Sequence, residues 1–566
     1  MNAATTLRSV MLGLAGFCML LSWLLPNHFR PWVTAYQDLL AAVALVLFAA
    51  AVLLGRGARL PTASILIGCL AIIPALQLAT GILTFAGDAW VSAAYILALA
   101  LAVFAGYNLQ SAEQGRGVAI FAEYLAWTLL LGAMVSAVLA VMQWLGFTQS
   151  FWVSSPPYPT RPFANMAQPN NLATLLGMGL MSLLYLFELR RVHRFPALLL
   201  ALMLIFALAL TQSRTPWITA LFVGGFWFWQ RRHIELRLEC RHMLLWLLIY
   251  MAMVVSVPLV TQYLGIGSGS LMDRLQQAAR LGMYQQFLHA ILEGPWYGYG
   301  WDQVFAAQAA VASAQVGHGP SIYTHNVLLD LLIWNGPIIG SLIIVTTGIW
   351  FWHLLRGARS LTATYAWLAF SCFLIHSMLE FPHAYLMLLL PAGLLLGLLQ
   401  ASVDAGHMAC AVPRLLTAAG VTSAAVLTAF MWQDYRLLEM EFNQAVLEHN
   451  EELIPKQQQA ISRIRMLTHM REYIYFIRAP LKSDYSDQQL EELLTSARRF
   501  PHFFFLLKSA HVMAINDRME EAHKALLLMG ELHKRPGLEQ ALDYLLMQSE
   551  KEPELLILVG RFGKEP

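Results

Sequence analysis

The sequence predicts an all-α membrane protein that crosses the bilayer many times and carries a soluble helical domain at its carboxyl end. Hydrophobic residues make up 58% of the chain and charged residues only 12%, with a mean hydropathy of +0.56. These values exclude an ordinary soluble protein. More than half of the charged residues lie after residue 433, in less than a quarter of the length. The sequence therefore predicts a membrane domain over 1–433 and a helical domain over 434–566.

Apolar runs near the length needed to cross a bilayer, about 20 residues, occur in about thirteen places. We expect transmembrane helices at 7–25, 37–54, 64–84, 90–108, 118–146, 170–187, 196–212, 216–229, 243–264, 336–354, 363–380, 384–400 and 415–432. The shortest pair flanks Arg214, where a helix is expected to break and restart before Pro216.

The orientation follows from the basic residues near the ends of these runs. Arginine-rich loops at 55–59, 190–194, 230–237 and 356–359 all fall on one side of the predicted topology. Loops rich in Lys and Arg stay in the cytoplasm, so this side is assigned to the cytoplasm. The opposite side receives a long loop over 265–335 and the whole region after residue 433.

The carboxyl-terminal region shows helical periodicity at 439–467, 487–499, 503–529 and 538–546. Residues 500–522 have the pattern of one helix, a short turn and the start of a second helix. This pattern suits both a helix-pair repeat and a plain helical bundle.

The overall charge and the cysteines carry no further functional signal. The net charge of +2 comes without a basic block, which gives no indication of nucleic-acid binding. The five cysteines lack metal-ligand spacing, so neither a disulfide framework nor a zinc site is expected. His376 and Glu380 are four residues apart on one helix face, but no third ligand follows in a recognisable pattern, and no metal is expected.

A polar segment, RPFANMAQPNNLA at 161–173, is the most informative part of the chain. It places an arginine, a glutamine and three asparagines between two membrane helices, where polar groups are costly unless they line a hydrated site. A second polar segment, YTHN at 323–326, falls on the same predicted face. We therefore expect an active site there, with Gln168 taking part and with substrate contacts from Asn165, Asn170, Asn171 and Asn326.

Three arginines are expected on that face: Arg161, Arg214 and Arg280. Arginines beside neutral amides suit an anion, because guanidinium groups bind phosphate oxygens in a fixed geometry. The alternative is that each arginine only reaches toward lipid headgroups.

His325 is the candidate proton acceptor, since a histidine can take up a proton near neutral pH. A structural role in hydrogen bonding is the alternative, and His318 is the nearest competitor.

The chain has neither an Asp-x-Asp cluster nor a glycine-rich phosphate loop, which argues against a nucleotide-sugar donor bound through a metal. A donor that suits both the membrane and the arginines is a glycan linked to polyprenyl diphosphate.

Taken together, these segments resemble the bacterial protein O-oligosaccharyltransferases of the PglL type, within the superfamily of O-antigen ligases and polymerases. Residues 25–32, 74–77, 87–90 and 161–173 resemble the protein-glycosylation-ligase region; residues 212–215, 280, 295–300 and 325–336 resemble the ligase core; residues 376–385 resemble the late loop. The chain departs from the family pattern at Ala164, where a glycine is expected, and at Asp38, where a glutamate is common.

The resemblance implies transfer of a preassembled glycan from undecaprenyl diphosphate to an acceptor hydroxyl, at the periplasmic face of the inner membrane and without a metal or other cofactor. His325 would be the base, Gln168 and Asn170 would hold a substrate, and Arg214 and Arg280 would bind the diphosphate. Tyr385 and Glu380 are further catalytic candidates.

Three acceptors remain open: Ser or Thr of a periplasmic protein or pilin, lipid A-core, and a growing O-antigen. A transporter of the same lipid is the alternative outside the enzymes. It would require charged residues at mid-membrane depth in broken helices, and Glu123 is the one obvious candidate.

Overall fold

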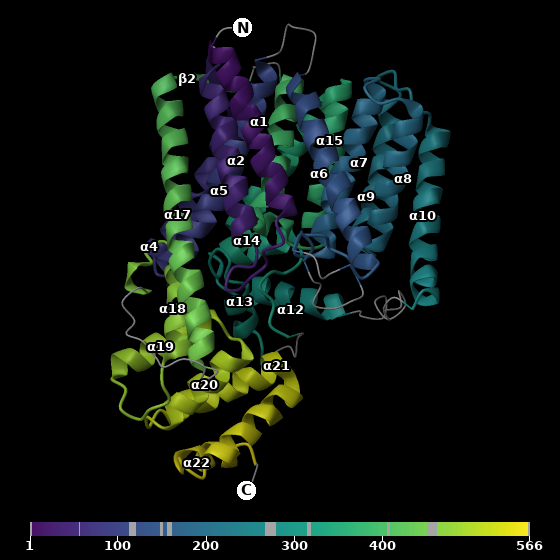
Figure 1. Cartoon of the computed structure of the whole chain (residues 1–566). Helices are drawn as coiled ribbons and strands as arrows, with labels where there is room; N and C mark the ends of the chain where they lie inside the picture. The colour runs from purple at the N-terminus through teal and green to yellow at the C-terminus, as the bar shows by residue number, and fades with distance from the viewer. Residues whose placement is uncertain are drawn as a thin grey trace. The chain divides into compact units, whose positions relative to one another are not determined.

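The computed structural model describes residues 3–55, 57–112, 120–147, 151–154, 161–265, 279–313, 319–404, 408–449 and 461–563. It forms two compact units, each built from separate stretches of the chain (Figure 1). Unit 1 contains Met1–Ile72, Ala93–Gln276 and Thr347–Gln433; unit 2 contains Ile73–Ser92, Gln277–Thr346 and Asp434–Pro566.

Unit 1 is a bundle of apolar helices. These are α1 (Ala3–Leu24), α2 (Ala35–Leu53), α3 (Thr62–Leu70), most of α5 (Ala86–Ser111), α6 (Ile120–Trp144), α7 (Pro169–Glu188), α8 (Arg194–Leu210), α9 (Thr215–Gln230), α10 (Cys240–Tyr263), α15 (Leu361–Ser377) and α16 (Leu386–Asp404). The carboxyl-terminal end of α14 (Val327–Gly357) and the first half of α17 (Arg414–His449) also belong to unit 1.

Every predicted apolar run coincides with helical structure, and the all-α membrane class is confirmed. Ten helices in the described part of the chain are long and apolar enough to span a bilayer. The count of thirteen is not confirmed, because α8, α9 and α15 have only 16 or 17 residues each. The break near Arg214 is confirmed, since α8 ends at Leu210 and α9 begins at Thr215.

Helix α16 forms the centre of unit 1, because almost all of its residues are buried. It packs against α2 and α15, while α6 packs against α7 and α8. The start of α16 is fixed by Asp38, whose carboxylate accepts from the backbone N–H of Met387 (3.2 Å) and from the hydroxyls of Thr34 (2.7 Å) and Tyr95 (2.9 Å). A carboxylate suits this position, since it lies at the positive end of a helix.

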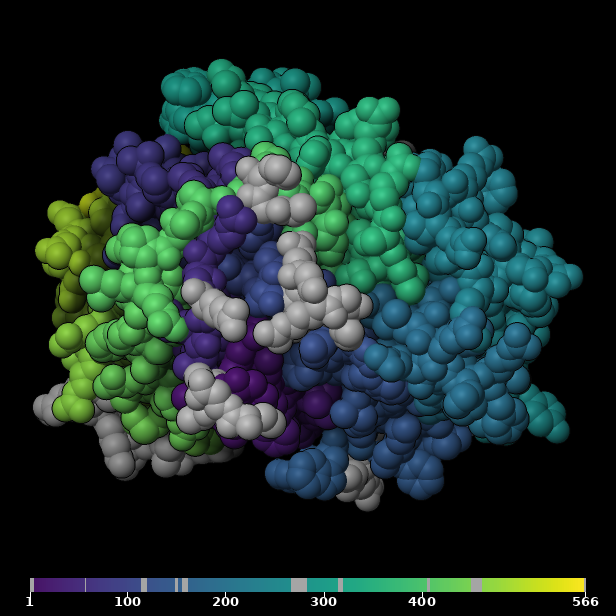
Figure 2. Space-filling view, turned by 90° about the horizontal axis from the view of Figure 1, so that it is seen from above, coloured from purple at the N-terminus to yellow at the C-terminus, as the bar shows by residue number. Residues whose placement is uncertain are grey.

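The arginine-rich loops are linked to one another at one end of unit 1, which we call the basic face. Figure 2 views the molecule from above, turned by 90° from the view of Figure 1. Two short strands join loops distant in sequence: β1 (Ala58–Pro61) pairs antiparallel with β2 (Ala409–Val412). The Gln230 side chain donates to the carbonyl of Ala358 (2.7 Å), which links two more of these loops. The contacts agree with the prediction that the basic loops share one side.

Glu123 also lies at the basic face, which corrects its assignment to mid-membrane depth. It is in the first turn of α6 and forms an ion pair with Arg191 at 2.8 Å.

Unit 2 combines α4 (Ile72–Ala79) and the start of α5 with the segment 279–346 and the carboxyl-terminal helices. Its helices are α12 (Ala279–Glu293), α13 (Val304–Ala310), the first part of α14, the second half of α17, α18 (Thr468–Arg478), α19 (Asp487–Arg499), α20 (Phe503–Ala514), α21 (Met519–Gln548) and α22 (Glu554–Gly560). Helix α14 bends at Gly336 before Pro337, where the sequence predicts a helix stop.

The predicted helices at 487–499 and 503–529 are confirmed, with a turn between α20 and α21. Part of the predicted helix at 439–467 falls on 450–460, outside the described residues. The division into 1–433 and 434–566 stays a prediction, and α17 runs without interruption across residue 433. The compact unit around the carboxyl-terminal helices also takes in 73–92 and 277–346.

Replacing Glu188 by alanine should lower the thermal stability of the protein in detergent. Its carboxylate accepts from the backbone N–H groups of Arg237 (2.6 Å) and Leu238 (2.9 Å), which fixes the loop after α9. Losing such bonds costs about 1–3 kcal/mol. Glu239→Ala in the same loop is the control, because Glu239 pairs with the exposed Arg241 and surface pairs contribute about 0–1 kcal/mol. Equal melting temperatures for the two variants would contradict this assignment.

Candidate active site

The loop at 161–168 is held by a glutamine from α6. The Gln143 side-chain oxygen accepts from the backbone N–H groups of Phe163 (2.9 Å) and Ala164 (2.7 Å), and its nitrogen donates to the carbonyl of Ala164 (2.6 Å). Buried backbone groups that lack a helical partner need such bonds. Gln143 therefore allows an irregular loop to enter the end of the helix bundle.

Asn165, which is part of the loop, also hydrogen-bonds backbone groups that lack a helical partner. Its amide donates to the carbonyls of Leu24 (2.6 Å) and Trp152 (2.9 Å) and accepts from the N–H of Ser154 (3.0 Å). The residue has no exposed surface. These contacts make it a loop-fixing residue, whereas the sequence suggests contact with substrate.

Several residues of the candidate site have a left-handed backbone, which is costly for residues other than glycine. The φ angles are 52° at Ala164, 62° at Ala167, 47° at Gln212 and 59° at His325. The first value explains why a glycine is expected at position 164. Strained backbone of this kind is concentrated at functional sites, where surrounding contacts enforce it.

Four of the predicted site residues gather where α7 begins. Gln168 donates to the hydroxyl of Tyr385 at 2.9 Å, and Asn171 also hydrogen-bonds that tyrosine. Burial is the main cause that raises the pKa of Tyr385, and the nearby carboxylates of Asp38 and Glu380 raise it further. The phenol therefore stays protonated and can donate a hydrogen bond to a substrate oxygen.

Arg161 joins this cluster to the break between α8 and α9. Its Nε donates to the carbonyl of Thr211 (2.8 Å) and its Nη2 to the side-chain oxygen of Asn170 (3.3 Å). Arg214 is the last residue of the break, and its exposed side chain has no hydrogen bond or ion pair with the residues that the structure describes. Two of the predicted arginines thus flank the amino ends of α7 and α9, where helix dipoles favour anions.

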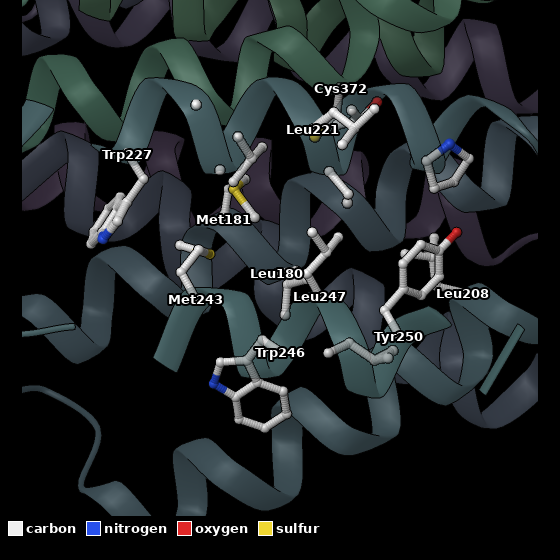
Figure 3. Close-up of a pocket in the computed structure, with 18 of the residues that line it drawn as sticks. Leu180, Met181, Leu208, Leu221, Trp227, Met243, Trp246, Leu247, Tyr250 and Cys372 are labelled. Carbon is white, nitrogen blue, oxygen red and sulfur yellow. The ribbon is translucent and has the colours of Figure 1, made fainter. Parts of the chain in front are cut away.

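An apolar cavity of about 360 Å³ lies among α7, α8, α9, α10 and α15 (Figure 3). Thr174, Thr215 and Pro216 contribute to its lining near the amino ends of α7 and α9. Trp227 and Tyr250 lie toward opposite ends of the cavity in Figure 3. The cavity therefore extends between apolar helices and includes Thr215, the residue that follows Arg214 in the sequence.

His325 belongs to unit 2 and sits in a tight turn before α14. The carboxylate of Asp330 accepts from the N–H of Thr324 (2.9 Å), and Tyr284 donates to the carbonyl of His325 at 3.4 Å. The Asn326 side chain accepts from the N–H of Leu328 (2.9 Å), as a helix N-cap does. Asn326 thus fixes the start of α14, whereas the sequence suggests contact with substrate.

The bend of α14 at Gly336 is held by a close approach of two backbones. A Cβ atom at Gly298 would lie 2.4 Å from the nitrogen of Gly336, so a larger residue cannot be accommodated there. Gln77 bridges the same region, donating to the carbonyl of Trp334 (2.8 Å) and accepting from the N–H of Trp301 (2.8 Å). These contacts give a structural role to the segments 74–77 and 295–300, which the sequence resemblance includes without assigning them a role.

The remaining candidates are less informative. His376 hydrogen-bonds the hydroxyl of Thr174 at 2.8 Å. Burial lowers the pKa of His383, within the late loop, to about 4. No group of three or more metal-ligating side chains occurs within the described ranges. Arg280 lies in α12, but its side chain and the whole of His318 fall outside the described residues.

Together, the apolar helices, the arginines and the amide-rich loops define a multi-pass membrane protein of the O-antigen ligase class. The O-antigen ligase profile matches residues 198–345, and the protein glycosylation ligase profile matches 162–187. A third profile, the carboxyl-terminal part of a virulence-factor membrane-bound polymerase, matches 364–534.

The chain is 30% identical over 552 residues to a general O-oligosaccharyltransferase of Acinetobacter baylyi, covering 94% of each chain. It is 29% identical over 326 residues to the ComP-specific O-oligosaccharyltransferase of the same organism, covering 57% of this chain and 58% of the relative. No solved structure matches. The chain belongs to the bacterial protein O-oligosaccharyltransferases and is a glycosyltransferase-type enzyme.

The left-handed backbone at Ala164 makes a prediction about its substitution. Ala164→Gly should leave stability and activity close to wild type, because glycine adopts this conformation without strain. Ala164→Val should lower the melting temperature clearly, since a β-branched residue is disfavoured at positive φ and the site is fully buried. Thermal unfolding in detergent would show the difference, and equal effects of the two substitutions would contradict it.

Proposed function

We propose that the protein transfers a preassembled oligosaccharide en bloc from undecaprenyl diphosphate to Ser or Thr hydroxyls of acceptor proteins. Membership of the O-oligosaccharyltransferase family supports the reaction class. The observation that carries the proposal is the position of Arg161 and Arg214 at the amino ends of α7 and α9, two helices that also line an apolar cavity. An amphiphile with an anionic head and an apolar tail suits this arrangement.

The diphosphate would bind Arg161 and Arg214, with Arg280 as a third contact. Charge-assisted bonds from guanidinium groups are stronger than neutral ones, and both helix dipoles add to them. The first isoprene units would enter the cavity, whose 360 Å³ falls in the usual range of about 300–1,000 Å³ for ligand pockets. The rest of the isoprenoid tail of the donor would lie in the membrane lipid.

His325 would act as the base. The acceptor hydroxyl attacks the anomeric carbon and gives its proton to the imidazole, while the bond from that carbon to the phosphate oxygen breaks and the diphosphate leaves. The arginines stabilise the negative charge that develops on the leaving group. A single in-line displacement inverts the anomeric configuration and needs one base. It also needs no metal, nucleotide or other cofactor.

Gln168, Asn170 and Tyr385 would orient the sugar or the acceptor, since their polar atoms gather at the start of α7. Glu380 contributes to the electrostatics around Tyr385. Asn171 supports the same cluster, while Asn165 and Asn326 act through the backbone that they fix.

We assign the protein to the bacterial inner membrane, with the basic face in the cytoplasm. The end of unit 1 that carries Arg161 and Arg214 would then face the periplasm. The region 434–566 would form a periplasmic helical domain. Its topology can be checked by placing single cysteines at Asp517 and at Arg232 and labelling intact cells with a membrane-impermeant maleimide.

The acceptor is tested by reconstitution with undecaprenyl-diphosphate oligosaccharide. Separate reactions would contain a periplasmic pilin-like protein or lipid A-core, with mass spectrometry of each product. Glycan on Ser or Thr supports the proposal. Glycan on lipid A-core alone would make the protein an O-antigen ligase, and lengthened donor glycan alone would make it a polymerase. The absence of any transfer would favour a transporter.

Arg214→Gln should weaken donor binding by about 10- to 100-fold, because a charged hydrogen bond contributes about 1.5–3 kcal/mol. Arg214→Lys should recover part of this loss, since lysine keeps the charge without the planar fork. Arg231→Gln is the matched control at the other end of α9. Binding of the lipid-linked donor to protein in nanodiscs gives the readout, and equal affinities for Arg214→Gln and Arg231→Gln would contradict the assignment.

His325→Asn should reduce the rate of transfer by about 10²- to 10⁴-fold, the usual effect of losing a general base, and leave donor affinity unchanged. Asparagine is chosen because it tolerates the left-handed backbone at this position but cannot act as a base. Single-turnover transfer and donor binding would be measured on the same preparation. Full activity of this variant would refute the role of His325.

A further inference from the structure

A buried ion-pair network in unit 2 connects the carboxyl-terminal helices to the turn that carries His325. At its centre is Arg499, the last residue of α19. Its guanidinium Nη2 donates to Asp88 at 2.8 Å and its Nε lies 3.1 Å from the second oxygen of the same carboxylate. The exposed fractions of the two side chains are 9% and 2%. Burial of this kind leaves little water to compete for the pair.

Asp302 extends the network toward the His325 turn. Its carboxylate lies 3.6 Å from Nη2 of Arg499 and accepts a hydrogen bond from the hydroxyl of Tyr323. Tyr323 is two residues before His325, and its ring contacts that of Trp334 in α14 with a centroid distance of 6.5 Å. Arg499 thus bridges two carboxylates, one of which holds the segment that leads into the turn.

Further contacts attach α13 and the residues that follow it, which lie between Asp302 and Tyr323 in the sequence, to the carboxyl-terminal helices. The ring of Phe305 contacts that of His502 at 5.3 Å, and Ala312 is part of the apolar core formed by α19 to α22. At the other side of Arg499, the N–H of Gly87 donates to Thr468 at 2.7 Å. A Cβ atom at Gly87 would lie 2.3 Å from His469, so this approach requires glycine.

The free-energy cost of removing these charged groups from water argues that the network has a function. Arg499 and Asp88 are buried, whereas the side chain of Asp302 is 29% exposed. Partial burial raises the pKa of Asp302, and the neighbouring carboxylate of Asp88 raises it further, although Arg499 opposes the shift. Buried ion pairs contribute little net stability, since desolvation offsets their attraction, but they fix one arrangement of the groups that they join. An apolar contact would hold α19 in place equally well without defining the position of Tyr323.

We propose that Arg499, Asp88, Asp302 and Tyr323 form a positioning network that holds His325 in its reactive orientation, so that the carboxyl-terminal helices complete the active site. The inference rests on the proposed role of His325 as the base. It makes the region after residue 434 necessary for the chemical step. A region that only recruits the acceptor would change acceptor affinity instead.

The test compares Arg499→Gln, Asp302→Asn and Tyr323→Phe with Arg518→Gln in the full-length protein. Arg518 is the matched control, because it pairs with Asp487 in the same helical region at an exposed position. We expect the three network variants to lower kcat by about 10- to 100-fold while the KM values for donor and acceptor change by less than about threefold, as for loss of transition-state positioning. Arg499→Lys should recover part of the kcat.

A double-mutant cycle with His325→Asn separates positioning from general support of the fold. If the network acts through His325, Arg499→Gln should cause no further loss of kcat in the His325→Asn background. Multiplicative losses, unchanged kcat in all three single variants, or losses that follow only the folded fraction at the assay temperature would overturn the inference alone. Full activity of His325→Asn by itself would overturn the proposed base together with this inference.

Discussion

The structure depends on one constraint: irregular backbone at the end of an apolar helix bundle must find hydrogen-bond partners. Neutral amide side chains satisfy it. Gln143 and Asn165 hold the loop at 161–168, and Gln77 joins two segments of unit 2. An amide both donates and accepts without carrying a charge, so it can fix a loop where an ionised group would be costly. The loops with left-handed residues persist because these bonds enforce them.

Local signals in the sequence predicted most of the helices and two of their breaks, but not the division of the run at 64–84 into α3 and α4. The Gly336-Pro337 pair and the segment before Pro216 interrupt helices as expected, because glycine and proline act on the backbone at their own positions. Basic residues near helix ends placed the loops of the basic face correctly relative to one another. Hydropathy did not reveal the role of Glu123, because its partner Arg191 lies 68 residues away in the sequence.

The roles of individual amides could not be predicted, because they depend on partners far away in the chain. Asn165 and Gln168 are three residues apart in one loop, yet the first bonds to Leu24 and the second to Tyr385. The same limit applies to Asp88 and Arg499, which are separated by 411 residues. The density of charged residues rises after residue 433, which marked that position as a domain boundary. In the structure, the continuous helix α17 runs across it.

Unit 2 combines the segment that carries His325 with the carboxyl-terminal helices, and this combination bears on how the proposed reaction is organised. A histidine on a turn is held only by its own short segment, unless other elements brace it. Here Asp330 of α14 holds the turn through Thr324, and Arg499 reaches the same segment through Asp302 and Tyr323. Catalytic groups must be held within a fraction of an ångström of the productive geometry. A helical region that supplies this rigidity has a reason to be joined to the membrane bundle by the continuous helix α17.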